Sequence, residues 1–107
     1  MNARLQNFFA YQALEQQRLE APEAGVEAID RETATLLPDI EPAIRQRIQM
    51  LIRHGQSNAL VPLEEEGFCG HCHRRLTPRE SQQVKLGDVI ACERCNRLVY
   101  SADEVAA

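Results

Sequence analysis

Four cysteines in the C-terminal part of the chain constrain its fold more than any other sequence feature. They form two CxxC pairs, Cys69 with Cys72 and Cys92 with Cys95, separated by nineteen residues. This spacing is typical of a zinc site, because a tight turn between two cysteines points both sulfurs at one ion. Four sulfur ligands leave no position for a substrate, so the sequence predicts one structural Zn²⁺ bound by Cys69, Cys72, Cys92 and Cys95. Iron, which occupies the same sulfur geometry, is the alternative.

Two shorter motifs within these pairs suggest other chemistry. The sequence Cys69-Gly-His-Cys72 also occurs in dithiol redox centres, but those need the pair at a helix N-terminus, and here a second CxxC follows. His73 completes a CxxCH haem-attachment motif, which would require export, and we expect no signal peptide from the N-terminal sequence. Because four cysteines are available, we expect His71 and His73 to lie beside the site rather than to bind the metal.

Charge divides the chain of 107 residues into two unlike parts. Residues 1–66 carry six arginines against eleven acidic residues, whereas residues 67–107 carry six basic residues against five acidic ones. The net charge of −4 argues against a general DNA-binding protein and leaves only a local basic patch for nucleic acid. No segment approaches the ~18 apolar residues that cross a bilayer. We therefore expect a cytoplasmic protein with no membrane partner, where paired cysteines usually hold metal.

Three helical segments are predicted before the cysteines, over residues 2–20, 22–36 and 40–54. Asn2 and Asp39 are expected to cap the first and third segments, because their side chains accept hydrogen bonds from free backbone N–H groups. Gly55 is expected to end the third segment, just after His54. Residues 1–55 are therefore predicted to form a short, coiled-coil-like helical hairpin or three-helix region.

Apolar residues recur on one side of each predicted helix. In the first helix the predicted stripe starts at Leu5, Phe8 and Phe9 and runs through two glutamines to Leu19, with Leu14 off the stripe. The stripes of the second and third helices are Val26, Ile29, Thr33 and Leu36, and then Ile40, Ile44, Ile48, Leu51 and Ile52. We interpret these stripes as core, with a homodimer or partner seam as the alternative.

The C-terminal part is predicted to be a small C4 zinc ribbon over residues 67–101. A linker over residues 56–66, with one short strand at 59–61, would precede it, and a tail over residues 102–107 would follow. Short antiparallel strands are expected at residues 73–76, 89–91 and 98–100. The predicted fold class is therefore α+β, with a helical region followed by a metal-stabilised ribbon.

The segment from Leu60 to Tyr100 carries several further features besides the cysteines. These are Val61-Pro62, Gly67 two positions before Cys69, His73 after Cys72, Leu76-Thr77-Pro78, Val84 with Gly87, Ile90, and Cys95-Asn96-Arg97-Leu98-Val99-Tyr100. Together they closely resemble the C4-type zinc-ribbon domain of a bacterial family with an N-terminal coiled-coil hairpin. The resemblance implies a zinc-binding adaptor or nucleic-acid-binding protein, and some relatives in that family are associated with flagellar gene expression and secretion.

The chain departs from this family in two places. Pro22 and Pro38 break what would be continuous coiled-coil arms, so the hairpin is expected to be much shorter here. Asn96 stands where the family usually has glycine after the last cysteine. Because Asn tolerates the left-handed backbone conformation, we expect the turn to be preserved.

The leading functional hypothesis is a non-enzymatic adaptor that binds a protein partner, regulatory or chaperone-like, through its helices. No arrangement of nucleophile and base in the sequence indicates an enzyme. A hairpin that inserts into RNA polymerase is a further class, in which Glu27, Asp30 and Glu32 would lie at the hairpin tip.

The alternative function is nucleic-acid binding by a basic face of the ribbon. Phosphates would be contacted by six basic side chains, and Phe68 or Tyr100 would be available for base stacking. The six are Arg74, Arg75, Arg79, Lys85, Arg94 and Arg97.

Overall fold

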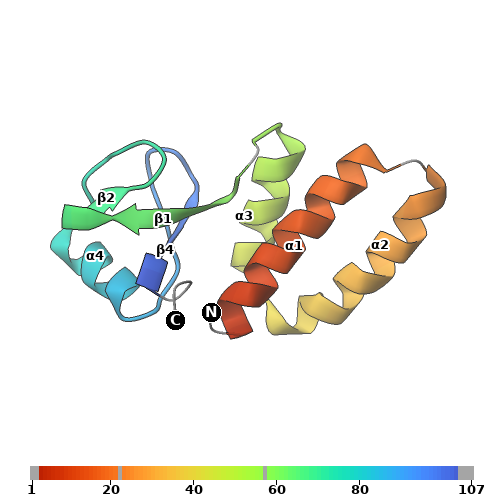
Figure 1. The fold of residues 1–107 in the computed structure, drawn as a ribbon, viewed down its shortest axis with the longest axis horizontal. Coiled ribbons are helices and arrows are strands. Elements are labelled where there is room, and N and C mark those ends of the chain that lie inside the picture. The colour runs from red at the N-terminus through yellow and green to blue at the C-terminus, as the bar shows by residue number, and fades with distance from the viewer. Residues whose placement is uncertain (1–2, 22, 57, 104–107) are drawn as a thin grey trace. The chain divides into compact units, whose positions relative to one another are not determined.

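The computed structural model describes residues 3–21, 23–56 and 58–103 (Figure 1). The chain divides into two compact units, a helical unit over Ala3–Ala59 and a ribbon unit that begins at Leu60. The first contains three α-helices, and the second contains a fourth helix and a four-stranded sheet. The α+β class predicted from the sequence is therefore confirmed. Across the described residues, no helix combines the length and apolar character needed to cross a membrane.

The three predicted N-terminal helices are present with small changes at their ends. They are α1 (Ala3–Glu20), α2 (Glu23–Leu36) and α3 (Pro42–Arg53), with a short 3-10 turn over Leu37–Asp39 between the last two. The expected cap Asn2 lies outside the described residues. Helix α1 packs against both α2 and α3 (Figure 1).

The predicted N-cap of the third helix was wrong. Asp39 lies in the 3-10 turn, and the residue that precedes α3 is Glu41. Its carbonyl accepts the first helical hydrogen bond, from the N–H of Arg45 at 3.0 Å. Pro42 explains the shift, because proline has no N–H to satisfy and its fixed φ suits the first helical position.

Gly55 ends α3 as predicted. It adopts a left-handed φ of 86°, its N–H donates to the Ile52 carbonyl at 3.1 Å, and the N–H of Gln56 donates to the Leu51 carbonyl at 3.0 Å. This pair of bonds is a Schellman motif, which satisfies the last carbonyls of the helix.

The buried face of α1 differs from the predicted stripe. Leu14 is buried, whereas Leu19, which was placed on the stripe, has 56% of its surface exposed. The difference arises because α1 contacts two helices and therefore buries a wider sector than a single stripe. The buried residues of α1 are Leu5, Phe8, Tyr11, Gln12, Leu14 and Glu15.

Two of the buried α1 residues are polar and have partners within the helical unit. The side-chain oxygen of Gln12 accepts the N–H of Ala59 at 2.7 Å, which ties the chain after α3 back to α1. The Glu15 carboxylate lies 3.6 Å from Nε of Arg53 in α3. The predicted apolar stripe of α3 is mostly buried, with Ile40, Ile48, Leu51 and Ile52 inside and Ile44 half-buried.

The sheet of the ribbon is mixed, although only antiparallel strands were predicted. Its strands are β1 (Leu60–Glu64), β2 (Phe68–Cys69), β3 (Ile90–Ala91) and β4 (Leu98–Tyr100), in the order β2-β1-β4-β3. The β1–β2 and β3–β4 pairs are antiparallel, but β1 and β4 are parallel, with Leu60 opposite Leu98. A parallel pair needs a long crossover, and the segment that carries both cysteine pairs provides it.

Helix α4 (Pro78–Lys85) was not predicted. Thr77 caps it in a reciprocal capping box, in which Thr77 Oγ1 accepts the Glu80 N–H at 3.2 Å and the Glu80 carboxylate accepts the Thr77 N–H at 3.0 Å. Of the strand expected at residues 73–76, only Arg75 pairs, in an isolated bridge with Phe68. Residues from helix, strands and turns share the ribbon core, namely Val61, Cys69, Leu76, Val84, Cys92 and Val99.

Candidate metal centre

The four cysteines lie together in the ribbon as free thiols. Their Sγ atoms are all within 4.8 Å of one another, with Cys69 and Cys95 3.8 Å apart and Cys72 and Cys92 3.6 Å apart. A disulfide would need about 2.05 Å. Four sulfurs at about 2.3 Å from one ion, placed at the corners of a tetrahedron, would be separated by about 3.8 Å. The cluster therefore has the dimensions of a site for a single tetrahedral ion.

The first CxxC pair forms a tight turn held by backbone hydrogen bonds. The N–H of Cys69 donates to the Arg74 carbonyl at 2.9 Å, and the N–H of His73 donates to the Cys69 carbonyl at 3.0 Å. His73, directly after Cys72, adopts a left-handed φ of 61°. These contacts curl the turn so that both sulfurs face the same side.

The second pair repeats the geometry of the first. The N–H of Cys92 donates to the Arg97 carbonyl at 2.8 Å, and the N–H of Asn96 donates to the Cys92 carbonyl at 2.8 Å. Asn96 has a φ of 63°, so the expectation that this turn survives without glycine is confirmed. Each pair therefore supplies two sulfurs from an equivalent turn.

The surroundings of the sulfurs shift the pKa values of three of the four thiols, and not all in the same direction. Burial raises the pKa of Cys69, and it raises the pKa of Cys95 to about 12. Burial acts in the same direction on Cys92, but N–H groups of Cys95 and Arg94 and the guanidinium of Arg74 outweigh it and lower the pKa of Cys92 to about 6. The Cys92 thiolate is thus stabilised by hydrogen bonds and by a neighbouring cation.

Arg74 connects the cysteine cluster to helix α4. Its interaction with the Cys92 thiolate raises the pKa of the guanidinium, and its Nη2 lies 3.4 Å from Oε1 of Glu80. Glu80 is the same carboxylate that completes the capping box with Thr77. The half-buried Arg74 therefore offsets negative charge at the cluster and is held in place by the start of α4.

We expect Arg74→Gln to weaken zinc binding by about tenfold, the lower end of the range for groups that support metal ligands. Glutamine removes the positive charge beside Cys92 and keeps a polar, though shorter, side chain. Competition with a chromophoric chelator measures the affinity, and Arg79→Gln, at an exposed position in the first turn of α4, is the matched control. Equal affinities in the two variants would show that Arg74 does not support the site.

The histidines lie outside the cluster of four cysteines found among the described residues. His71 and His73 are exposed, and Nδ1 of His73 lies 2.7 Å from a carboxylate oxygen of Glu64. His54 directly follows α3 as its C-cap. The cluster found among the described residues therefore consists of cysteines alone.

The six basic residues considered for nucleic-acid contact do not form a uniform face. Arg97 is buried and Arg74 is half-buried, so both have limited access to a phosphate. The guanidinium of Arg75 lies 5.7 Å from the ring centre of Phe68, which is half-buried, as is Tyr100. The exposed members of the set are Arg75, Arg79, Lys85 and Arg94.

Comparison with known proteins gives one structural neighbour. No family model matches the chain, and no curated protein matches it. The solved structure of the HP0958 protein from Helicobacter pylori CCUG 17874 is similar, with a TM-score of 0.54 and 23% identity over 75% of this chain. The match spans 34% of that protein, so the chain corresponds to about a third of its length. At this identity the similarity establishes a related fold.

Proposed function

We propose that the chain is a non-enzymatic, zinc-stabilised adaptor of the reducing cytoplasm that binds a protein partner through its helical unit. The observation that carries the zinc part is the gathering of four Sγ atoms within 4.8 Å. Cys69, Cys72, Cys92 and Cys95 would hold the ion. Thiolates prefer soft or borderline metals, and an all-sulfur tetrahedral site favours Zn²⁺. With four protein ligands the ion crosslinks the ribbon and leaves no position for a substrate, which is the basis for proposing no enzymatic activity.

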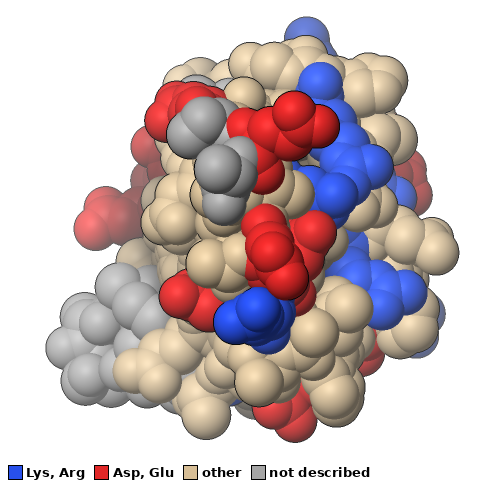
Figure 2. Space-filling model, turned by 90° about the vertical axis from the view of Figure 1, so that its right-hand side faces the viewer, with Lys and Arg blue, Asp and Glu red and all other residues tan. Residues whose placement is uncertain are grey.

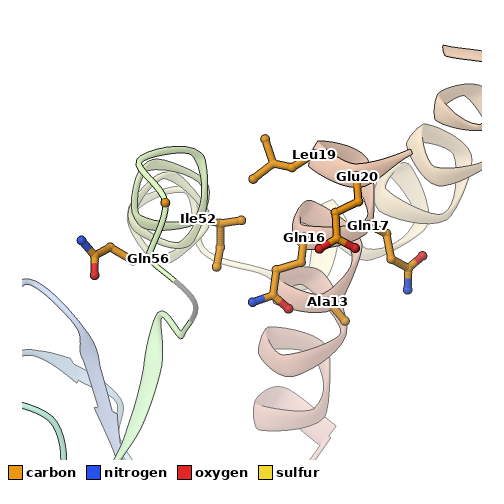
Figure 3. A pocket seen from close by; sticks show the side chains of 8 residues that line it. Ala13, Gln16, Gln17, Leu19, Glu20, Ile52 and Gln56 are labelled. Carbon is orange, nitrogen blue, oxygen red and sulfur yellow. The ribbon is translucent and has the colours of Figure 1, made fainter. Parts of the chain in front are cut away.

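The surface of the helical unit supports a protein partner. A hollow of about 470 Å³ lies between α1 and the end of α3 (Figure 3). Its lining residues are Ala13, Gln16, Gln17, Leu19, Glu20, Ile52, Gly55 and Gln56. Leu19 at its edge is 56% exposed, although leucine is usually buried. The hollow is lined mainly by uncharged side chains, with Glu20 as its charged member, and Leu19 adds exposed apolar surface for a partner to cover.

Nucleic-acid binding by the ribbon is less well supported. Two of the six basic residues expected to contact phosphates have limited access to them. Arg97 is buried, and Arg74 interacts with Cys92 and Glu80. Charge on the helical unit is also unfavourable. Figure 2, viewed from the side of α2, shows acidic side chains over the middle of that face, with basic ones along one side and also directly below the acidic ones.

A tagged pull-down from lysate, with and without nuclease, tests the proposal. We expect a co-purifying protein that survives nuclease and is lost in Leu19→Gln, because this change removes apolar contact area at the hollow. Leu86→Gln, at a leucine of the ribbon that is 77% exposed, is the matched control and should retain the partner. Loss of every partner on nuclease treatment, with binding abolished by reversing the charges of Arg75 and Arg79, would instead establish the nucleic-acid function.

A further inference from the structure

Helix α1 carries an exposed ridge of small and polar side chains between α2 and α3. The side chains recur every three or four residues, so they lie on one face of the helix. The ridge consists of Gln6, Ala10, Ala13, Gln17 and Glu20, and all five are exposed. The two alanines leave little side chain above the backbone, which lets another helix approach closely.

A hollow lies on each side of this ridge. The first, toward α3, is the one that contains Leu19 (Figure 3). The second, of about 430 Å³, lies toward α2, and both hollows are lined by Ala13 and Gln17. The other lining residues of the second hollow are Ala10, Leu14, Glu32, Thr35 and Leu36. A low ridge between two hollows fits a helix laid along α1, because side chains three or four residues apart can enter the hollows on either side.

The charge around the hollows indicates which side chains the bound helix would carry. Among the described residues that line them, the charged ones are Glu20 in the first hollow and Glu32 in the second. Both are exposed. The helical unit as a whole has eight acidic residues against six arginines over residues 3–59. A partner with basic side chains beside its apolar ones would complement this surface.

We propose that the α1 ridge binds a basic amphipathic helix of the protein partner. Its aliphatic side chains enter the two hollows, and its Lys or Arg side chains reach Glu20 and Glu32. The inference rests on the proposed adaptor function and adds to it the face that is used and the chemistry of the segment that is recognised.

Fluorescence anisotropy with a labelled synthetic helix tests this directly on the zinc-loaded full chain. The probe has leucine at every third or fourth position and lysine between, and a second probe has glutamate in place of lysine. We expect the lysine probe to bind and the glutamate probe to bind at least about tenfold more weakly.

Ala13→Arg should weaken binding of the lysine probe by about tenfold or more, because the longer side chain blocks close approach to the ridge and adds a charge like that of lysine. Ala28→Arg, at an exposed alanine of α2 outside both hollows, should change it less than about twofold.

Several outcomes would overturn the inference. Equal binding of the two probes would show that charge does not select the bound helix. Equal effects of the two arginine substitutions would show that the helix does not bind at the ridge. A chain that sediments as a dimer and is dissociated by Ala13→Arg would show that a second copy occupies the face. If Ala13→Arg keeps its nuclease-resistant partner but loses the probe, the ridge is not the partner site, although the adaptor function stands. A native chain without such a partner would contradict the adaptor function itself.

Discussion

Replacing Cys92 by Ser is expected to abolish zinc binding and to unfold the ribbon. The serine hydroxyl is a poor ligand for zinc, and the loss of one of four sulfurs leaves an open tetrahedron. In small metal-stabilised modules, binding and folding are one event, and structural zinc contributes an apparent ~10–16 kcal/mol. Cys92 also lies fully buried in the ribbon core, so the site and the core fail together.

Metal analysis after dialysis and a thermal scan of the same sample measure both consequences of the Cys92→Ser change. His71→Ser is the control, because it changes an exposed side chain within the first CxxC turn and leaves all four sulfurs in place. We expect the control to keep one zinc and its cooperative transition. Retention of both by Cys92→Ser would show that the ribbon does not depend on a four-sulfur zinc site.

Gly70→Ala is expected to destabilise the zinc-loaded ribbon by about 3 kcal/mol or more, the upper part of the range for overpacking. A Cβ at Gly70 would collide with the carbonyl oxygen of Pro62 and lie 3.0 Å from its Cδ. Pro62 belongs to β1 and is opposite Tyr100 of β4, so the atoms in the way are part of the sheet and cannot rotate aside. The first CxxC turn would have to move away from β1.

Urea denaturation of the zinc-loaded chain measures the cost at Gly70, with Gly55→Ala as the comparison. Gly55 has open space around a new Cβ but a φ of 86°, so alanine there should cost only about 1 kcal/mol through backbone strain. A smaller loss at Gly70 than at Gly55 would mean that the first turn does not depend on its close approach to β1.

The cluster of four cysteines could be predicted because its signal is local. Two residues between cysteines determine a turn, and the two pairs together determine a four-sulfur site, so no knowledge of the remaining fold was needed. The helices over residues 3–53 were predicted for a similar reason, because the apolar periodicity of each helix can be recognised within its own segment of the sequence. The exposure of Leu19 was not predicted, because the width of the buried face depends on how many helices surround α1.

Helix α4 was missed although a local signal exists. Only Ser81 and Val84 are buried in it, so no apolar stripe marks it as a helix. Thr77 followed by Pro78 and then by Glu80 is a capping-box sequence with proline at the first helical position, and this would have predicted its start. The parallel β1–β4 pair and the burial of Arg97 had no comparable signal, because both result from contacts between distant parts of the chain.

We expect the parallel pairing of β1 with β4 to make formation of the sheet depend on the metal. These neighbouring strands are the first and last of the ribbon, and β4 pairs with β3 as well. Bringing Leu98 to Leu60 without metal requires closing a long loop, whose entropic cost grows with its length. Metal bound at both CxxC turns shortens the loop that must close, because β4 begins shortly after Cys95. During synthesis, a chain that has emerged only as far as Cys95 holds every ligand but lacks the strand that joins β1 to β3. We therefore expect metal binding and formation of the sheet to be completed together, once Leu98–Tyr100 has emerged.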